Sequence, residues 1–365
     1  MKKIVIGVTL VSVALIGTVA ALPAILPVLL PIWEQNRPLP TVVVDGAMRQ
    51  QAVDSLVAKL EAHYVFPEKV KPIGTLLRQR LRNGDYDALS NGEQLAKTLT
   101  ADMASVAHDL HMEVDFSRAV VPSQEDLPGA TRPKPEQDLF FMRWIDALGR
   151  KMAKFGVQKA EPLPSNIGLL ALTRFSRPEL SGDKYAAALD KLAGTGAMII
   201  DLRGNSGGSP QAVALLVSYF VDKRTRLNDI YSRDTGLTEQ FWTEDTLAGK
   251  RYGAQKKVAI LVGPNTRSAA EDFAYTMQAM KRATVIGGRT WGGAHPTGGY
   301  RLGDHFIAFI PNARSISPIT HTNWEGVGVI PDIAATPADA MAVAEAHLLR
   351  SAPGKAGVRP ALPVQ

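Results

Sequence analysis

The second half of the chain alternates short apolar runs with amphipathic stretches, and this alternation constrains the fold more than any other feature. The apolar runs have the length of strands, and the amphipathic stretches carry apolar residues at helical spacing. The predicted strands are 167–175, 197–202, 258–262, 284–286 and 306–310, and the predicted helices are 185–192, 211–220, 269–280 and 338–349. This order predicts an α/β domain over residues 166–350, with helices packed on a sheet.

A helical region precedes this domain. In residues 47–64 the apolar side chains recur at helical spacing. Pro67 is suited to the first turn of a second helix, and Ser90 with Glu93 forms a capping box for a third. We therefore predict a small N-terminal helical bundle, which together with a following strand forms a domain over residues 45–116.

The period changes to two at residues 110–116, where apolar and polar side chains alternate. This pattern predicts a half-buried strand with His111 on its polar face. Residues 117–165 are rich in proline and charge, and we interpret them as a connector that is short for an inserted domain. Residues 351–365 are rich in proline and glycine and predict a flexible tail.

The N-terminus carries a targeting or anchoring pattern. Lys2 and Lys3 precede an uncharged run over residues 4–33. A basic start followed by an apolar core is typical of a signal peptide, and this run is also long enough to span a bilayer. We therefore assign residues 1–35 to a signal peptide or a membrane anchor. Both alternatives predict export across the cytoplasmic membrane to a periplasmic or other extracytoplasmic site, soluble or anchored.

Composition excludes several classes of site. The chain has no cysteine, which excludes a cysteine nucleophile, disulfides and thiolate metal ligands. The net charge of +6 is not concentrated in a run of Lys or Arg, so we interpret it as a solvated surface and predict no nucleic-acid partner. A chain of 365 residues, 45% of them hydrophobic, can form one or two domains. The sequence leaves the oligomeric state unknown.

A glycine-rich turn follows one predicted strand. Residues 201–209 read Asp-Leu-Arg-Gly-Asn-Ser-Gly-Gly-Ser, and a helix opens at Pro210. Glycines let backbone N–H groups approach a ligand closely, and the helix start adds the positive end of a dipole. Such a turn can bind a phosphate or an oxyanion, but it lacks the Gly-Lys-Ser/Thr ending of a phosphate loop. An ordinary tight turn is the alternative.

A serine begins a predicted helix after another apolar strand. Residues 263–271 read Gly-Pro-Asn-Thr-Arg-Ser-Ala-Ala-Glu, which places Ser268 at the helix start. A serine there ordinarily caps the helix. The same geometry can also present its hydroxyl at the sheet edge, with the next N–H free to bind an oxyanion. A serine nucleophile needs a base, and spacing does not choose one. The histidines considered are His111, His295, His305 and His321.

A third stretch combines an acid with a defined turn. Residues 323–332 read Asn-Trp-Glu-Gly-Val-Gly-Val-Ile-Pro-Asp. Glu325, beside a tryptophan, can orient a histidine, and a solvated glutamate is the alternative.

Together, these three stretches resemble the C-terminal-processing (tail-specific) and tricorn-type serine peptidases, whose core is a crotonase-like α/β domain. The chain is most similar to the branch named after interphotoreceptor retinoid-binding protein. The additional matches to that branch are Tyr64-Val65-Phe66-Pro67, Asp109-Leu110-His111, Gly292-Gly293-Ala294-His295 and Asn323-Trp324-Glu325-Gly326.

The resemblance implies a serine endopeptidase that acts on a polypeptide without metal or cofactor. It implies Ser268 as nucleophile, His111 as base and Glu325 as the acid that completes the relay. The residues that it implies for the oxyanion hole are Gly207, Gly208 and Ala269, and we assign substrate binding to Asn205 and Gly293.

Two departures narrow this expectation. Tail-specific members use a Ser–Lys dyad, but glycine stands at the lysine position in the turn 290–293. Residues 117–165 are too short for the PDZ module that recognises substrate tails in those members. The alternative from another class is a non-catalytic carrier of retinoid-like or fatty-acid ligands on the same fold. An envelope scaffold is a third alternative, which depends only on the N-terminal segment.

Overall fold

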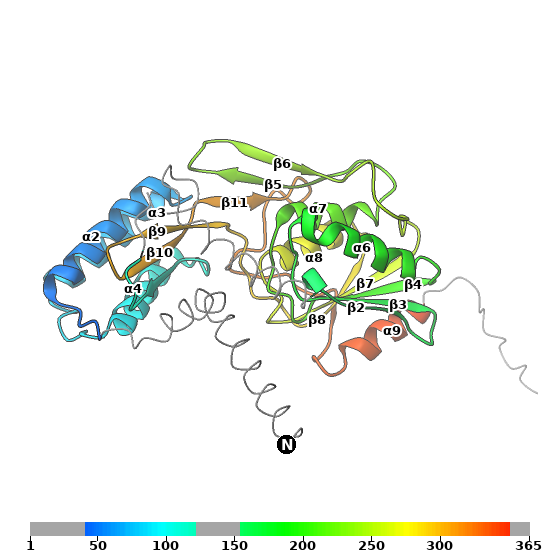
Figure 1. Ribbon diagram of the computed structural model, residues 1–365, viewed down its shortest axis with the longest axis horizontal. Coiled ribbons are helices and arrows are strands. Elements are labelled where there is room, and N and C mark those ends of the chain that lie inside the picture. The colour runs from blue at the N-terminus through cyan, green and yellow to red at the C-terminus, as the bar shows by residue number, and fades with distance from the viewer. Residues whose placement is uncertain (1–40, 122–153, 351–365) are drawn as a thin grey trace, which may run out of the picture. The chain divides into compact units, whose positions relative to one another are not determined.

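The computed structural model describes residues 41–121 and 154–350 (Figure 1). Its helices are α2 (Gly46–His63), α3 (Pro67–Arg82), α4 (Gly92–Ala107), α6 (Pro178–Leu192), α7 (Pro210–Ser218), α8 (Ala269–Ala279) and α9 (Ala340–Arg350). Its strands are β1 (Glu113–Phe116), β2 (Val157–Pro162), β3 (Ile167–Leu172), β4 (Ala197–Asp201), β5 (Arg226–Ser232), β6 (Thr238–Trp242), β7 (Lys257–Val262), β8 (Thr284–Gly287), β9 (Thr297–Arg301), β10 (Phe306–Pro311), β11 (Ala313–Ile316) and β12 (Ile333–Ala334).

A six-stranded sheet in the order β12-β8-β7-β4-β3-β2 is the centre of the α/β part. Its strands are parallel except for β2, which pairs antiparallel with β3 at one edge. In the middle of the sheet, Ile199 of β4 is paired with Leu169 and with Ala259. The central strands are continuous apolar runs because helices cover both of their faces.

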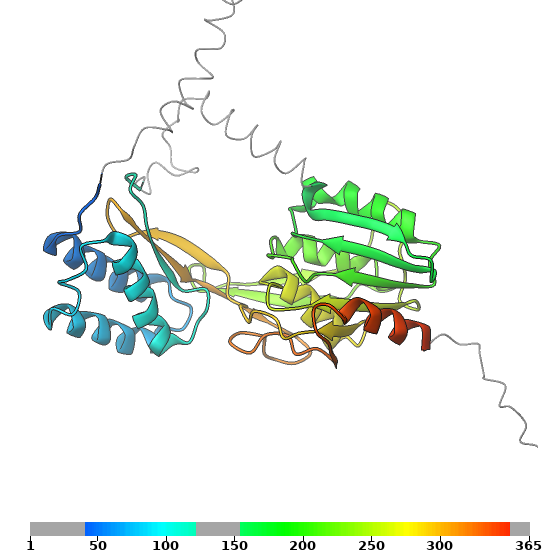
Figure 2. The same cartoon turned by 90° about the horizontal axis from the view of Figure 1, so that it is seen from below.

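Successive side chains of β4 enter two separate cores. Met198 and Ile200 pack with apolar residues of α6, α7 and α8, whereas Ala197 and Ile199 pack with those of α9. Figure 2 shows α9, in red, on the opposite side of the sheet from the green helices. The alternation follows from the period of two in a strand.

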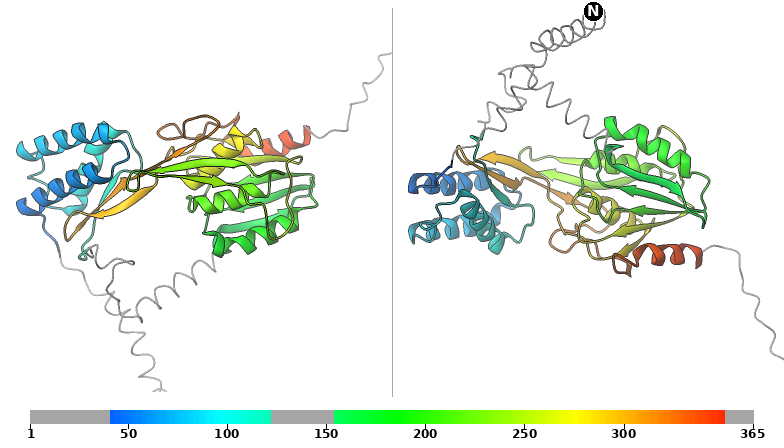
Figure 3. Two further views of the ribbon diagram at one scale, coloured as in Figure 1. Left: turned by 90° about the horizontal axis from the view of Figure 1, so that it is seen from above. Right: turned by 60° about the horizontal axis from the view of Figure 1, so that its bottom comes forward.

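The helices α2, α3 and α4 pack with a second sheet, of order β1-β10-β9. Figure 3 shows the orange strands beside the blue and cyan helices. Leu56, Leu60 and Leu99 of the helices share a core with Phe306 and Ile310 of β10. A third sheet, β11-β5-β6, is formed by a hairpin and one more strand.

The predicted helices and strands of the α/β domain are all present, and the fold is of the mixed α/β class. The start of α6 at Pro178 lies before the predicted start at residue 185. The sequence analysis did not predict β2, β5, β6, β9, β11 or β12.

Two local predictions are wrong. The capping residue of α4 is Asn91, not Ser90, because the Asn91 side chain accepts from the N–H groups of Glu93 and Gln94. His111 does not lie on the polar face of a strand. It lies in a turn before β1, partly buried.

The segment that we interpreted as a connector contains structure. Val157–Pro162 forms β2, so the main sheet begins before residue 166. Within residues 41–121 and 154–350, no helix is both long and apolar enough to cross a membrane. The predicted signal or anchor at 1–35 and the predicted tail at 351–365 lie outside the described residues.

Candidate active site

Ser268 occupies the turn between β7 and α8, where it is the N-cap residue of the helix. Its backbone has φ 51° and ψ −122°, a region that side-chain-bearing residues rarely adopt. The Ser268 N–H donates to Glu271 Oε2 at 2.9 Å. Observed strain at a helix start that follows a buried strand is typical of a residue held for function rather than for stability.

The glycine-rich turn lies directly against Ser268. A Cβ at position 207 would lie 2.8 Å from Ser268 Cβ and 3.1 Å from the Ala269 nitrogen. A Cβ at position 208 would lie 2.0 Å from the Phe175 carbonyl oxygen. Both glycines also have positive φ, 96° and 144°. Only glycine fits these two positions, so the turn approaches the serine as closely as a backbone can.

Two backbone donors near the serine are available to a ligand. The Gly207 N–H is already bonded to Asn205 Oδ1 at 2.9 Å. In contrast, the N–H groups of Gly208 and Ala269 have no acceptor among residues 41–121 and 154–350. Asn205 is fully buried, and its Nδ2 also lacks a partner in this part of the chain. Ala269 and Asn205 are buried, whereas Gly208 is exposed. Buried donors without partners are rare, so these unpaired donors mark a candidate anion site.

The carboxylate of Glu271 organises the turn opposite Ser268. It is fully buried and accepts from Thr290 Oγ1 at 2.6 Å, in addition to the Ser268 N–H. It also accepts from the N–H groups of Gly292 at 2.6 Å and Gly293 at 3.0 Å. Burial raises the pKa of Glu271, and these hydrogen bonds oppose the increase.

His111 lies against the segment that Glu271 holds. A Cβ on Gly293 would lie 2.3 Å from His111 Cε1, so the imidazole contacts the glycine backbone. Trp291 packs edge-on against the ring, with centroids 4.8 Å apart. The buried Nδ1 of His111 has no partner among the described residues. Burial lowers the pKa of His111 to about 4, and the nearby Asp109 carboxylate opposes this shift. The imidazole is therefore neutral near pH 7.

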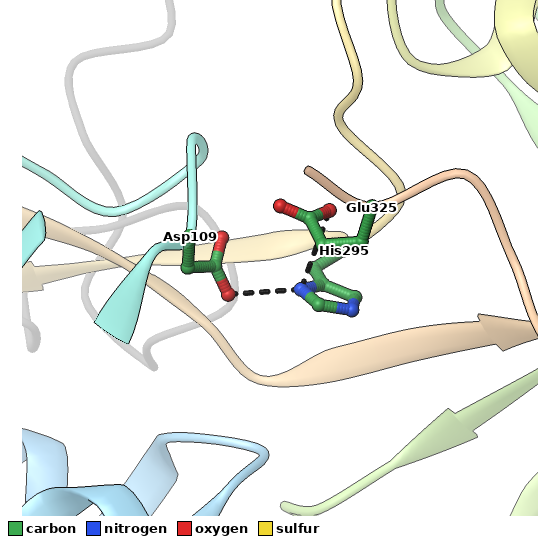
Figure 4. Close-up of side chains that lie close together, drawn as sticks. All are labelled: Asp109, His295 and Glu325. Carbon is green, nitrogen blue, oxygen red and sulfur yellow. Dashed lines mark hydrogen bonds and ion pairs between the residues drawn. The ribbon is translucent and has the colours of Figure 1, made fainter. Parts of the chain in front are cut away.

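Asp109, His295 and Glu325 form a buried cluster (Figure 4). The cluster adjoins His111, because Asp109 accepts the His111 backbone N–H at 3.2 Å. The Nδ1 atom of His295 lies 2.8 Å from Asp109 Oδ2 and 3.4 Å from Glu325 Oε2. Glu325 Oε2 also accepts from the Ala294 N–H at 2.5 Å. Burial raises the pKa of Glu325 to about 7, with a further increase from Asp109 and a decrease from His295.

This cluster also has the composition of a metal site. One ligand atom from each of Asp109, His295 and Glu325 lies within 4.8 Å of the others. However, protein donors already bond both carboxylates: Asp109 accepts from the His111 N–H and the Tyr64 hydroxyl, and Glu325 from two backbone N–H groups. The cluster is therefore complete as a hydrogen-bonded unit without an ion.

The structure brings some of the predicted site residues together and keeps others apart. Gly207 and Ala269 lie next to Ser268, Gly208 follows Gly207 in the same turn, and His111 contacts Gly293. Within the described residues no hydrogen bond joins His111 to Ser268 or to Glu325, and Glu325 contacts His295 instead. The sequence analysis assigned no role to two residues of this site, Asp109 and Glu271, and it considered His295 only as one of four candidate bases. Asp109, Glu271 and His295 all lie inside motifs quoted in the sequence analysis, so those motifs were the sequence signal that could have identified them.

Two family models match the chain in succession. One describes peptidase family S41 and matches residues 166–335, and the other describes the N-terminal domain of peptidase S41 in eukaryotic IRBP and matches residues 47–148. Both models describe parts of peptidase family S41, and the chain is similar to that family over residues 47–148 and 166–335. The match to the first model includes Ser268, the glycine-rich turn and Glu325, and the match to the second includes His111.

Curated relatives in the S41 family are processing peptidases. The chain is 30% identical over 167 residues to carboxyl-terminal-processing peptidase 2, chloroplastic, of Arabidopsis thaliana, a match that covers 46% of this chain and 31% of the relative. It is 30% identical over 135 residues to the carboxy-terminal processing protease CtpA of Bacillus subtilis, covering 36% and 27%. The chain thus matches about a third of the length of these relatives.

Solved structures show the same fold. A putative peptidase from Parabacteroides merdae superposes with a TM-score of 0.56 at 18% identity, covering 85% of this chain and 99% of the other. Mature CPAF complexed with lactacystin superposes with a TM-score of 0.54 at 12% identity, covering 84% and 97%. Because the match extends over nearly all of these structures, the described part of this chain contains the elements of an S41 peptidase fold.

Proposed function

We propose that this protein is a serine endopeptidase in which Ser268 is the nucleophile. The observation that carries the proposal is the strained N-cap position of Ser268 beside two free backbone donors, those of Gly208 and Ala269. Such donors stabilise the oxyanion of a tetrahedral intermediate, and losing one typically costs about 10²–10³ in turnover. Similarity to family S41 and the names of its curated relatives support the same chemistry.

In the proposed reaction, Ser268 Oγ attacks the scissile carbonyl carbon while His111 accepts the hydroxyl proton. The carbonyl oxygen, now negative, is bound by the N–H groups of Gly208 and Ala269, with Gly207 supporting the turn. His111 then gives its proton to the leaving amine, which leaves an acyl-enzyme. Water, deprotonated by the same imidazole, attacks the ester and releases the carboxylic product.

His111 and Glu325 complete the proposed relay. The neutral imidazole of His111 can accept a proton at pH 7. Its contact with Ser268 would form when substrate binds, because catalytic hydrogen bonds are often absent in a ligand-free site. Glu325 acts on the turn that carries His111 rather than on the ring itself, since it accepts the Leu110 N–H at 3.3 Å.

Several finer assignments belong to the same proposal. The substrate is a polypeptide, and the unpartnered Asn205 amide and the Gly293 backbone contact it. The catalytic domain has a crotonase-like core that includes β2 and extends to residue 350. Residues 45–116 form the N-terminal helical domain, whose core also includes residues of β9 and β10. Residues 1–35 direct export, by a cleaved signal or by a retained anchor.

The test is a comparison of the full-length wild type with Ser268→Ala. Cleavage of an unfolded protein is measured together with labelling by a fluorophosphonate, which reacts with activated serines. We expect the wild type to cleave and label and the variant to do neither, with His111→Ala slowed by about 10²–10⁴. A folded wild type that neither cleaves nor labels would contradict the proposal. Saturable binding of retinol or a fatty acid by that inactive protein would then favour the carrier alternative.

A further inference from the structure

Two carboxylates share one short segment of backbone. The consecutive N–H groups of residues 292–294 donate to Glu271 and Glu325: the first two to Glu271, and the third to Glu325. Glu271 also accepts the Ser268 N–H, and Glu325 also accepts an N–H from the turn that carries His111. The segment 292–294 therefore links the backbone of the proposed nucleophile to the backbone of the proposed base.

On the His111 side, a second carboxylate and an imidazole complete this link. Asp109 Oδ1 accepts the His111 N–H at 3.2 Å, and Asp109 Oδ2 lies 2.8 Å from His295 Nδ1. The same Nδ1 lies 3.4 Å from Glu325 (Figure 4). An N–H placed between two carboxylates can donate to both, and it offsets their mutual repulsion.

The cluster is buried deeply enough for these bonds to be strong. The side chains of Asp109, His295 and Glu325 are 2%, 4% and 12% exposed. Charge-assisted hydrogen bonds strengthen when water is excluded, and removing one partner leaves the other charge uncompensated. Removing the imidazole would therefore leave the carboxyl groups of Asp109 and Glu325 without the donor that lies between them.

We propose that His295 is a positioning residue: with Asp109 it fixes Glu325 and the turn of His111 against residues 292–295. It thereby sets the place of the His111 ring relative to Ser268. This inference rests on the proposed function, because the distance between base and nucleophile matters only if the two act together.

The environment of His111 provides a readout for this role. The ring is wedged between Gly293 and Trp291, and this burial lowers the pKa of His111 to about 4. If the turn loosens, water reaches the ring and the pKa rises toward its ordinary value of about 6.5. The titratable and charged groups near His111 and the cluster are Tyr64, Lys69, His108, Asp109, His295, Arg314, His321 and Glu325.

The decisive variants are His295→Asn and His295→Gln in the full-length protein. The asparagine amide nitrogen can take the place of the imidazole Nδ1, whereas the glutamine amide reaches toward the place of Nε2. We expect His295→Gln to lower the fluorophosphonate labelling rate and kcat by about 10–100-fold, with KM within about twofold of wild type. His295→Asn should stay within about threefold of wild type. Circular dichroism establishes that both variants are folded.

A second measurement needs no activity. In Ser268→Ala protein with isotopically labelled histidine, the Cε1 signal of His111 is titrated by NMR. We expect a low pKa in the parent and in His295→Asn, and a clear increase toward 6.5 in His295→Gln. If the wild type has no peptidase activity, the proposed function fails, and this titration still decides the positioning role of His295.

Three results would overturn the inference. The first is a His295→Gln variant with wild-type rates and an unchanged His111 titration. The second is equal impairment of both variants, which a general structural role of His295 would produce. The third is loss of labelling on EDTA treatment with recovery on addition of Zn²⁺, which would mean that an ion joins the three side chains.

Discussion

At the scale of single residues, the place of Ser268 depends on a carboxylate one turn along its own helix. The sequence Ser268-Ala-Ala-Glu271 is a capping-box pattern, so one of the four hydrogen bonds of Glu271 could be predicted from spacing alone. The other three involve residues 290–293, which only the fold brings near. The sequence therefore predicts Ser268 as the nucleophile, but it does not predict most of the hydrogen bonds by which Glu271 fixes the turn around Ser268.

The pairing of Asp109 with His295 illustrates the same limit. The two residues are 186 positions apart, and no spacing rule connects them. Resemblance drew attention to His111 and Glu325, whereas the structure places His295 between Glu325 and Asp109. Which histidine meets which acid is decided by packing, and a single sequence does not report it.

A prediction at this scale concerns Gly207. In Gly207→Ala the new Cβ would lie within 3 Å of both Ser268 Cβ and the Arg267 carbonyl oxygen, at a positive φ. We expect a loss of about 1–3 kcal/mol in the free energy of unfolding, and a loss of about 10² or more in kcat/KM, because the serine turn must shift. Urea unfolding and peptide hydrolysis measure the two quantities.

The matched control is Gly204→Ala in the same turn. A Cβ there meets no heavy atom within 4 Å. We expect stability within about 0.5 kcal/mol and activity within about twofold of wild type. Equal behaviour of the two alanine variants would contradict the close approach of Gly207 to Ser268.

At the scale of elements, the α/β core could be predicted because its strands are apolar runs and its helices are amphipathic. The missed strands lack these patterns. β9 reads Thr-Gly-Gly-Tyr-Arg, which favours a loop, and it becomes a strand by pairing with β10. Strand formation at such positions comes from a neighbour rather than from intrinsic preference.

The start of α4 tests how finely an element boundary can be predicted. Ser90 and Asn91 are both good N-cap residues, and sequence patterns place helix ends only to within one or two positions. The structure assigns the cap to Asn91, whose Oδ1 accepts two backbone N–H groups. We expect Asn91→Ala to lower the free energy of unfolding by about 1 kcal/mol and Ser90→Ala by less than about 0.5 kcal/mol. Urea unfolding of both variants tests this prediction. A larger loss in Ser90→Ala than in Asn91→Ala would show that Ser90 is the N-cap residue.

At the scale of the whole molecule, the buried cluster makes folding depend on pH. The pKa of Glu325 is raised from 4.5 to about 7, so the folded state holds its proton more tightly than the unfolded state. The resulting stability is fully present below pH 4.5 and is lost as pH rises through about 7. The contribution is on the order of 3 kcal/mol.

Glu325→Gln should remove this dependence, because an amide does not titrate. In urea unfolding, we expect the free energy of unfolding of the wild type to fall relative to that of the variant as pH rises from 5 to 8. His111 and Asp272 also have shifted pKa values, but both are present in each protein and cancel in the difference. A difference that stays constant with pH would show that Glu325 is not protonated in the folded state.

The positive φ of Ser268, the proposed nucleophile, lowers the stability of the folded state. A side chain held at φ 51° and ψ −122° costs the folded state about 1–3 kcal/mol, and glycine adopts this region freely. We expect Ser268→Gly to be inactive yet about 1 kcal/mol more stable than Ser268→Ala, which keeps the strain without the hydroxyl. Thermal melting compares them, and equal stability would mean that the backbone is relaxed. If the expectation holds, the positive φ at residue 268 lowers the resistance of the folded chain to heat, and only a residue without a side chain removes that loss.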